Sequence, residues 1–179
     1  MSQIGTVYAQ ALYSLAREDG AAQTILDELK ALDESFAQEP AYVRLLASPN
    51  LTKDERCRIL DEGFRGKLHP YVLNFMKILT EKGYIRHFSD CFHAYREQYN
   101  EDNGILPVCA VTAVPLSSQQ AAKLTAKLEK LTDKTVELTN RIDPACLGGV
   151  RLDYDGKRVD GTVRSRLDAI HNMLKNTVL

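Results

Sequence analysis

Apolar residues recur at helical spacing through the first hundred positions of the chain. One stripe runs from Ile4 to Leu15 and a second from Ile25 to Phe36. A spacing of three and four residues predicts amphipathic helices that bury one face. Four further stripes follow with short breaks between them, near residues 43–46, 54–62, 70–79 and 85–99. The pattern therefore predicts six helices joined by short loops.

Local signals support these helix boundaries. Thr52 is followed three positions later by Glu55, the spacing of a capping box, which predicts a helix start at residue 53. Pro70 suits the first turn of the fifth helix, and Gly83 suits its end.

The pattern changes after Gly104. The segment "ILPVCAVTAV" at 105–114 is rich in Val, and "KTVELTNRI" at 134–142 alternates, so both predict strands. Ser117 opens a helix between them. A hairpin is predicted around Asp155-Gly156, and Asp160 is expected to cap a last helix that starts at Gly161. We therefore expect an α+β chain, with an N-terminal six-helix bundle followed by a small C-terminal domain of short strands and two helices.

The same change places a domain boundary between residues 104 and 105. Residues 1–104 carry 12 Lys and Arg against 16 Asp and Glu, whereas residues 105–179 carry 11 against 8. The opposite net charges, −4 and +3, indicate that the two domains face different partners.

Composition excludes several functional classes. The net charge of −1 does not favour nucleic acid or anionic lipid as a partner. Because no apolar run approaches the ~20 residues that span a bilayer, and the start lacks a basic and apolar signal pattern, we expect neither a membrane span nor a secretion signal. The four scattered cysteines predict buried, reduced thiols.

The segment 147–167, "LGGVRLDYDGKRVDGTVRSRL", is the main candidate for chemistry. A helix start followed by Arg164 and Arg166 suits a phosphate, because free amides and the helix dipole attract anions there. The alternative is purely structural: glycines that permit close approach, a hairpin turn and a capping carboxylate. We favour this alternative for Gly148, Gly149, Asp155, Gly156, Asp160 and Gly161.

Other catalytic and metal-binding patterns are weak. The spacing from Gly63 to Gly66 is too short for a phosphate-binding P-loop. His87 and Cys91 lie four apart on one predicted helix, but a zinc site needs three or four ligands. We therefore expect no catalytic residue, no metal and no cofactor.

Two helices carry more apolar surface than one core requires. On the first, apolar positions from Val7 round to Ala9 cover an arc of roughly 200° at ~100° per residue. The fifth helix, at residues 71–79, leaves only a narrow polar strip. Either both helices are central to the bundle, or their extra edge binds an amphipathic helix of a partner.

Several motifs resemble one known family over nearly the whole length of the chain. The chain resembles the delta subunit of the bacterial rotary ATP synthase, a family that includes the mitochondrial oligomycin sensitivity-conferring protein. The matching segments are "YAQALYSLA" at 8–16, Asn74-Phe75 with Gly83 and Ile85, "VTAVPLSSQQ" at 111–120, Asp143-Pro144, Leu147-Gly148-Gly149, Asp155-Gly156-Lys157 and residues 160–167. The family often has an arginine where Tyr84 stands here.

The resemblance implies a non-catalytic stator component. In this family the N-terminal domain binds the N-terminal helix of an alpha subunit between its first and fifth helices, and the C-terminal domain binds the b-subunit peripheral stalk. Such a protein is peripheral, at the cytoplasmic face of the bacterial cell membrane. By matched position, the implied alpha-subunit contacts are Tyr8, Ala11, Leu15, Phe75 and Ile78, and the implied stalk contacts are Leu167, Ile170 and Leu174.

Two alternatives from other classes stay open at this point. One is a small phosphate-binding enzyme that uses Arg164 and Arg166, which phosphate or nucleotide would stabilise. The other is a generic two-domain adaptor with unknown helical partners.

Overall fold

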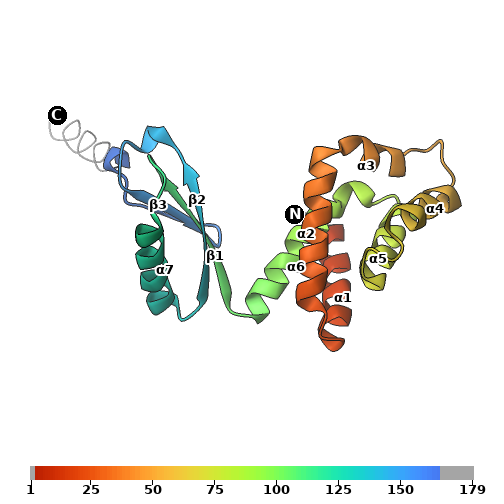
Figure 1. Ribbon diagram of the computed structural model, residues 1–179, viewed down its shortest axis with the longest axis horizontal. Helices are drawn as coiled ribbons and strands as arrows, with labels where there is room; N and C mark the ends of the chain where they lie inside the picture. The colour runs from red at the N-terminus through yellow and green to blue at the C-terminus, as the bar shows by residue number, and fades with distance from the viewer. Residues whose placement is uncertain (1–2, 166–179) are drawn as a thin grey trace, which may run out of the picture. The chain divides into compact units, whose positions relative to one another are not determined.

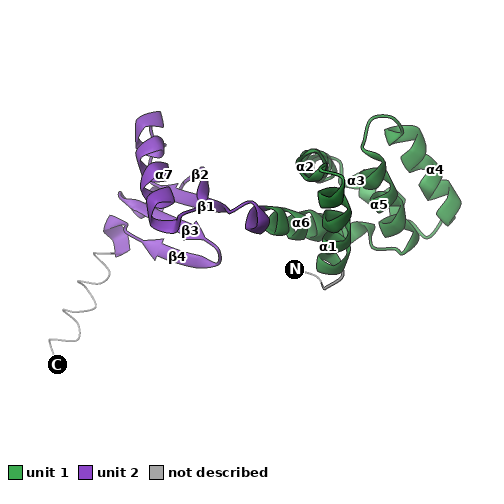
Figure 2. Cartoon of the chain, turned by 90° about the horizontal axis from the view of Figure 1, so that it is seen from below, with its two compact units in different colours: residues 1–99 green, residues 100–179 purple. Residues whose placement is uncertain are grey.

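The computed structural model describes residues 3–165, which form two compact units. The division falls between Tyr99 and Asn100, in the last turn of a helix (Figure 2). Each unit has its own cluster of buried apolar side chains. The chain is α+β, with the sheet confined to the second unit.

Unit 1 is helical throughout its described residues. Its core collects the apolar stripes, for example Ile25, Leu29, Leu32 and Phe36 of one helix. Residue 85 belongs to a separate 3₁₀ turn rather than to the sixth helix, which begins at Phe88. The elements are α1 (Gln3–Glu18), α2 (Ala22–Gln38), α3 (Pro40–Leu46), α4 (Lys53–Phe64), α5 (Pro70–Glu81), η1 (Ile85–His87) and α6 (Phe88–Asp102) (Figure 1).

The predicted capping box at the start of α4 is confirmed. The Glu55 amide donates to Thr52 Oγ1 at 3.3 Å, and the Thr52 amide donates to the Glu55 carboxylate at 2.8 Å. This bond from the backbone holds the pKa of Glu55 below its ordinary value.

Unit 2 is a four-stranded mixed sheet with α7 against one face (Figure 1). The strand order is β2-β1-β3-β4, with β1 and β2 parallel and the other two pairs antiparallel. Leu106, Val108 and Val136 form its small core. The elements are β1 (Ile105–Thr112), α7 (Ser118–Thr132), β2 (Thr135–Ile142), η2 (Pro144–Cys146), β3 (Val150–Tyr154) and β4 (Lys157–Asp160).

Over residues 3–165, the structure contains no helix that combines the length and the apolar character needed to cross a membrane.

Candidate protein-binding site

Helices α1 and α5 lie against each other in opposite directions (Figure 1). The hydroxyl of Tyr71, at the start of α5, donates a hydrogen bond to the carboxylate of Asp19, just after the end of α1. At the other end, the ring of Tyr84, which follows α5, meets the ring of Tyr8 near the start of α1, edge to face at 6.1 Å between centroids. The two contacts fix the pair antiparallel.

Local backbone chemistry determines where these two tyrosines lie. Pro70 occupies the first turn of α5, and the Tyr71 amide donates to His69 Nδ1 at 3.3 Å. After α5, the Tyr84 amide reaches back to the Leu79 carbonyl at 2.7 Å and the Gly83 amide to the Thr80 carbonyl at 3.1 Å. This pair of bonds is a Schellman motif, which ends the helix and positions Tyr84.

The bond to Asp19 also changes the acidity of Tyr71. Because the carboxylate accepts the phenol proton and carries a nearby negative charge, the pKa of Tyr71 is raised above its ordinary value. The ordinary value is already 10.0, so the phenol is protonated and can donate at physiological pH.

The predicted site residues divide between the surface and the core. Ala11 is exposed and Tyr8 is half-buried, while Leu15 and Ile78 expose 49% and 44% of their surface. Phe75 is different: it exposes only 6%, and its ring centroid lies 6.4 Å from that of the core residue Phe88. Phe75 therefore belongs to the core.

Val7 was not among the predicted contacts, although it lies four residues before Ala11. It exposes 63% of its surface, so Val7, Ala11 and Leu15 form one exposed row along α1. The four-residue spacing of these three apolar residues in the sequence is enough to predict the row. We call the accessible set of Val7, Tyr8, Ala11, Leu15 and Ile78 the α1–α5 face.

The glycine-rich segment of unit 2 that begins at Gly148 forms a close backbone crossing. The Gly161 amide donates to the Val150 carbonyl and the Val163 amide to the Gly148 carbonyl, each at 3.0 Å. A Cβ on Gly149 would lie 2.6 Å from the Gly161 carbonyl oxygen, which no side chain tolerates. These contacts support a structural role for the motif.

The predicted hairpin is present, but the predicted helix cap is wrong. Asp155 and Gly156 connect β3 and β4. The last helix begins at Val163, and the Ser165 amide donates to Thr162 Oγ1 at 3.2 Å, so Thr162 is the cap. Asp160 instead accepts from the Thr162 amide at 2.9 Å and from its hydroxyl at 2.7 Å.

These bonds leave little place for a phosphate. They hold the pKa of Asp160 below its ordinary value, so a carboxylate already lies at the helix start. Arg151, nearby, pairs with Asp153 at 3.5 Å. A pocket of about 250 Å³ here has two carboxylates among its lining residues, which include Asp143, Cys146, Arg151, Asp160, Thr162, Arg164 and Ser165. Arg166 lies outside the described residues.

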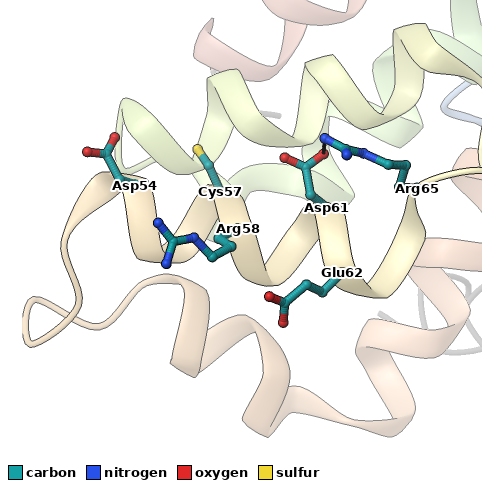
Figure 3. Close-up of a pocket in the computed structure, with 6 residues that line it drawn as sticks. All are labelled: Asp54, Cys57, Arg58, Asp61, Glu62 and Arg65. Carbon is teal, nitrogen blue, oxygen red and sulfur yellow. Dashed lines mark ion pairs between the residues drawn. The ribbon is translucent and has the colours of Figure 1, made fainter.

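A larger pocket, of about 550 Å³, lies along α4 (Figure 3). Asp61 pairs with Lys77 at 2.7 Å and with Arg65 at 3.5 Å. Partial burial and the carboxylate of Glu81 raise the pKa of the Cys57 thiol, which disfavours a nucleophilic thiolate. The lining residues are Asp54, Cys57, Arg58, Asp61, Glu62 and Arg65.

The pair of His87 and Cys91 does not have the properties of a metal site. His87 Nδ1 lies 3.3 Å from the Asp90 carboxylate. Cys91 is buried, and this burial raises its pKa to about 11, so the thiolate that metals bind is strongly disfavoured. Among residues 3–165 no cluster of three or more His, Cys, Asp or Glu side chains could hold a metal.

The implied stalk contacts Leu167, Ile170 and Leu174 lie outside the described residues.

Known proteins are similar to this chain in both sequence and fold. The family model described as ATP synthase delta (OSCP) subunit matches residues 4–174. The chain is 32% identical over 172 residues to ATP synthase subunit delta of Alkaliphilus oremlandii, covering 96% of each chain. It is 30% identical over 176 residues to that of Clostridioides difficile, covering 98% of this chain and 97% of the relative.

A chain of the Toxoplasma gondii mitochondrial ATP synthase hexamer has the same fold. The TM-score is 0.77 at 18% identity, over 97% of this chain and 98% of that one. The family match covers nearly the whole sequence, and both relatives are at least 30% identical to the chain over nearly their full length. The chain therefore belongs to the ATP synthase delta (OSCP) subunit family, whose members are non-catalytic stator components of the peripheral stalk.

Proposed function

We propose that this chain joins the catalytic head of a rotary proton-translocating ATP synthase to its peripheral stalk. The six-helix bundle of residues 1–104 binds the N-terminal helix of an alpha subunit on the α1–α5 face. The domain of residues 105–179 binds the end of the b-subunit stalk. The chain is then peripheral at the cytoplasmic face of the bacterial membrane, and it contacts the membrane only through the complex.

The observation that carries the proposal is the exposed apolar row of the α1–α5 face. Val7, Leu15 and Ile78 expose between 44% and 63% of their surface on two adjoining helices. Each large side chain that a partner helix covers contributes ~1.5–3 kcal/mol, less the cost of ordering that helix. Ala11, small and exposed in the middle of the row, allows the partner to approach closely.

The geometry of the α1–α5 pair suits a joint that resists torque. A stator has to transmit force without chemistry, so its binding surface should not deform when pulled. The Tyr71–Asp19 hydrogen bond holds one end of the pair and the Tyr8–Tyr84 contact holds the other. Pulling α1 away from α5 would break both contacts.

Unit 2 offers a second apolar surface for the stalk. Leu152 and Tyr154 pack on the small core yet remain partly exposed, and Val159, cross-strand from Leu152, exposes 51%. Within the described chain, α7 has no fully buried side chain, and Leu131 exposes 72%. This half-covered sheet supports stalk binding there, with Leu167, Ile170 and Leu174 as further proposed contacts.

The first test is a titration of the full-length protein with a peptide of the N-terminal helix of its cognate alpha subunit. We expect one-to-one binding. In Ala11→Asp the docked peptide would bury an unpaired carboxylate, so affinity should fall at least ~100-fold, which corresponds to about 2.8 kcal/mol. Because Ala11 is exposed, the circular dichroism spectrum and melting temperature should not change.

The matched control is Ala31→Asp, the same change at an exposed position in the middle of α2. It should bind as tightly as wild type. Equal affinities of Ala11→Asp and wild type, or equal losses in both variants, would refute the α1–α5 face as the binding site.

The two alternatives predict different results. A generic adaptor would bind unrelated amphipathic helices as tightly as the alpha-subunit peptide. The phosphate-binding enzyme is disfavoured because the family is non-catalytic. The pure chain should therefore hydrolyse no ATP, and phosphate should not raise its melting temperature.

A further inference from the structure

We propose that Asn103 is a site of spontaneous deamidation, which converts its side chain into aspartate or isoaspartate in the turn that connects α6 to β1. Asn103 is followed by Gly104, and no other asparagine in the sequence precedes a glycine. The reaction needs no enzyme, and water is its only co-reactant. The inference goes beyond the proposed function and does not depend on it, because it concerns a chemical change within this chain alone.

Asn103 and Gly104 supply all the reacting atoms except those of water. The Gly104 nitrogen loses its proton and attacks Asn103 Cγ, so a bond between this nitrogen and Cγ forms as the bond from Cγ to Nδ2 breaks. The Nδ2 group leaves as ammonia and takes up that proton. Water then opens the resulting ring: attack at the side-chain carbonyl gives aspartate, and attack at the main-chain carbonyl gives isoaspartate.

The surroundings of Asn103 leave room for this attack. Asn103 is exposed, together with Glu101 and Asp102 before it. A Cβ placed on Gly104 would meet no atom within 4 Å beyond those of the neighbouring residues, so the space beside the attacking nitrogen is open. Gly104 itself has no side chain that could obstruct the approach of its nitrogen to Asn103 Cγ.

One hydrogen bond restrains the attacking nitrogen. The Gly104 amide donates to the Glu101 carbonyl at 3.2 Å, just after the end of α6. The last turn of this helix carries Glu101 and Asp102 and no basic residue. Because the negative end of the helix dipole repels these carboxylates, the last turn opens more readily than the middle of the helix. Each opening frees the Gly104 nitrogen to react.

The other asparagines of the described chain lack this combination of features. Asn74 and Asn100 lie inside helices, and the side chain of Asn140 is held by hydrogen bonds to the neighbouring strand. Asn50 is exposed in a turn, as Asn103 is, but it precedes Leu51, whose side chain obstructs the attack. Asn50 is therefore an internal control for the effect of the following glycine.

Isoaspartate at this position would change the start of the sheet. The Gly104 carbonyl accepts the Thr135 amide at 2.9 Å, directly before Ile105 pairs with Thr135 in the parallel register of β1 and β2. Isoaspartate adds one methylene group to the main chain before Gly104, which displaces this carbonyl relative to the Thr135 amide. Aspartate keeps the length of the main chain and adds only a negative charge beside Glu101 and Asp102.

The first measurement is mass spectrometry of proteolytic peptides of the full-length protein, sampled during storage at neutral and mildly alkaline pH. Asn103 should deamidate on the order of 10-fold faster than Asn50, because only Asn103 is followed by a residue without a side chain. Both isoaspartate and aspartate should form, and the rate should rise with pH because the attacking nitrogen must lose its proton. Aspartate alone, or equal rates at Asn103 and Asn50, would overturn the inference.

Two variants separate the two residues that react. Asn103→Gln leaves the backbone unchanged at an exposed position, and the ammonia released per chain should fall to a small fraction of the wild-type amount. Gly104→Ala fits the open space and should slow deamidation of Asn103, since it restores a side chain after the asparagine. Ammonia release from Asn103→Gln at the wild-type rate would show that the reaction lies elsewhere, and would overturn the inference.

Hydrogen exchange tests the consequence for the sheet. In stored protein that contains isoaspartate, the Thr135 amide should exchange faster than in fresh protein, because its acceptor is displaced. Freshly prepared Asn103→Asp carries the added charge without the added methylene group, so its Thr135 amide should exchange at the rate of fresh wild type. Equally slow exchange in the isoaspartate form would overturn the inferred effect on the start of β1 and β2.

Discussion

Gly149 allows two backbone segments of unit 2 to cross closely because it has no Cβ. Its φ of +78° is left-handed, and a Cβ there would meet the Gly161 carbonyl at 2.6 Å. Gly156 is also left-handed, but a Cβ there would meet nothing within 4 Å. A substitution at Gly156 therefore tests backbone strain alone, whereas a substitution at Gly149 tests backbone strain and steric overlap together.

We predict that Gly149→Ala destabilises unit 2 by about 3 kcal/mol, the sum of ~1–2 for the left-handed backbone and a similar overlap term. Gly156→Ala should cost only the backbone part. Urea unfolding monitored by amide signals of the sheet measures both. Equal losses in the two variants would contradict the close crossing at Gly149.

At the residue scale, the sequence predicted which side chains of a helix are apolar and face a neighbour, but not which of them are buried in the core and which are exposed. The arc of apolar positions on α5 correctly included both Phe75 and Ile78, but an arc wide enough for two surfaces does not say which residue faces which. That depends on where α6 brings Phe88. Likewise Asp160 and Thr162 are both good capping residues two positions apart, and the backbone path between them decides which one caps.

At the scale of elements, local chemistry determined most boundaries. The hydroxyl of Thr52 and the carboxylate of Glu55 satisfy amides that the start of α4 would otherwise leave free. The same arrangement, with Ser117 and Gln120, opens α7. Both were visible in the sequence because each box depends on residues only three positions apart.

We predict that Thr52→Ala costs about 1 kcal/mol of unit 1 stability. The control Thr24→Ala makes the same change at an exposed site inside α2, where alanine favours the helix. Chemical denaturation at pH 7 measures both. A Thr24→Ala variant that loses as much as Thr52→Ala would contradict the capping role.

The capping box also predicts a pH dependence. The pKa of Glu55 is lowered in the folded chain, so its contribution is present above the ordinary value of 4.5 and is lost as pH falls through the lowered folded value. The stability difference between wild type and Glu55→Gln should therefore shrink as the pH falls below 4.5. A difference that grows on acidification would be inconsistent with the bond from the Thr52 amide.

The sequence patterns of the single elements did not predict how the strands pair. Both "ILPVCAVTAV" and "KTVELTNRI" read as strands, but their parallel pairing depends on α7 carrying the chain back across the sheet. The order β2-β1-β3-β4 is non-local, since β1 pairs with strands beginning 30 and 45 residues later. Periodicity within one segment contains no such information.

At the scale of the whole molecule, the two units have separate cores and the α1–α5 face lies entirely in unit 1. We predict that residues 1–104 fold alone and bind the alpha-subunit peptide within about twofold of the full chain. Calorimetry on the fragment measures this. A loss beyond about tenfold would mean that unit 2 contributes to the site.

The central claim is that this chain links the head to the stalk, and sedimentation of a three-component mixture tests it most directly. Cognate catalytic head lacking this subunit, the soluble part of the b subunit and the full-length chain would be combined. The account predicts that the b subunit sediments with the head only when the chain is present, and that Ala11→Asp releases the chain and the b subunit together. Sedimentation of the b subunit with the head in the absence of the chain, or no complex with all three present, would contradict the account.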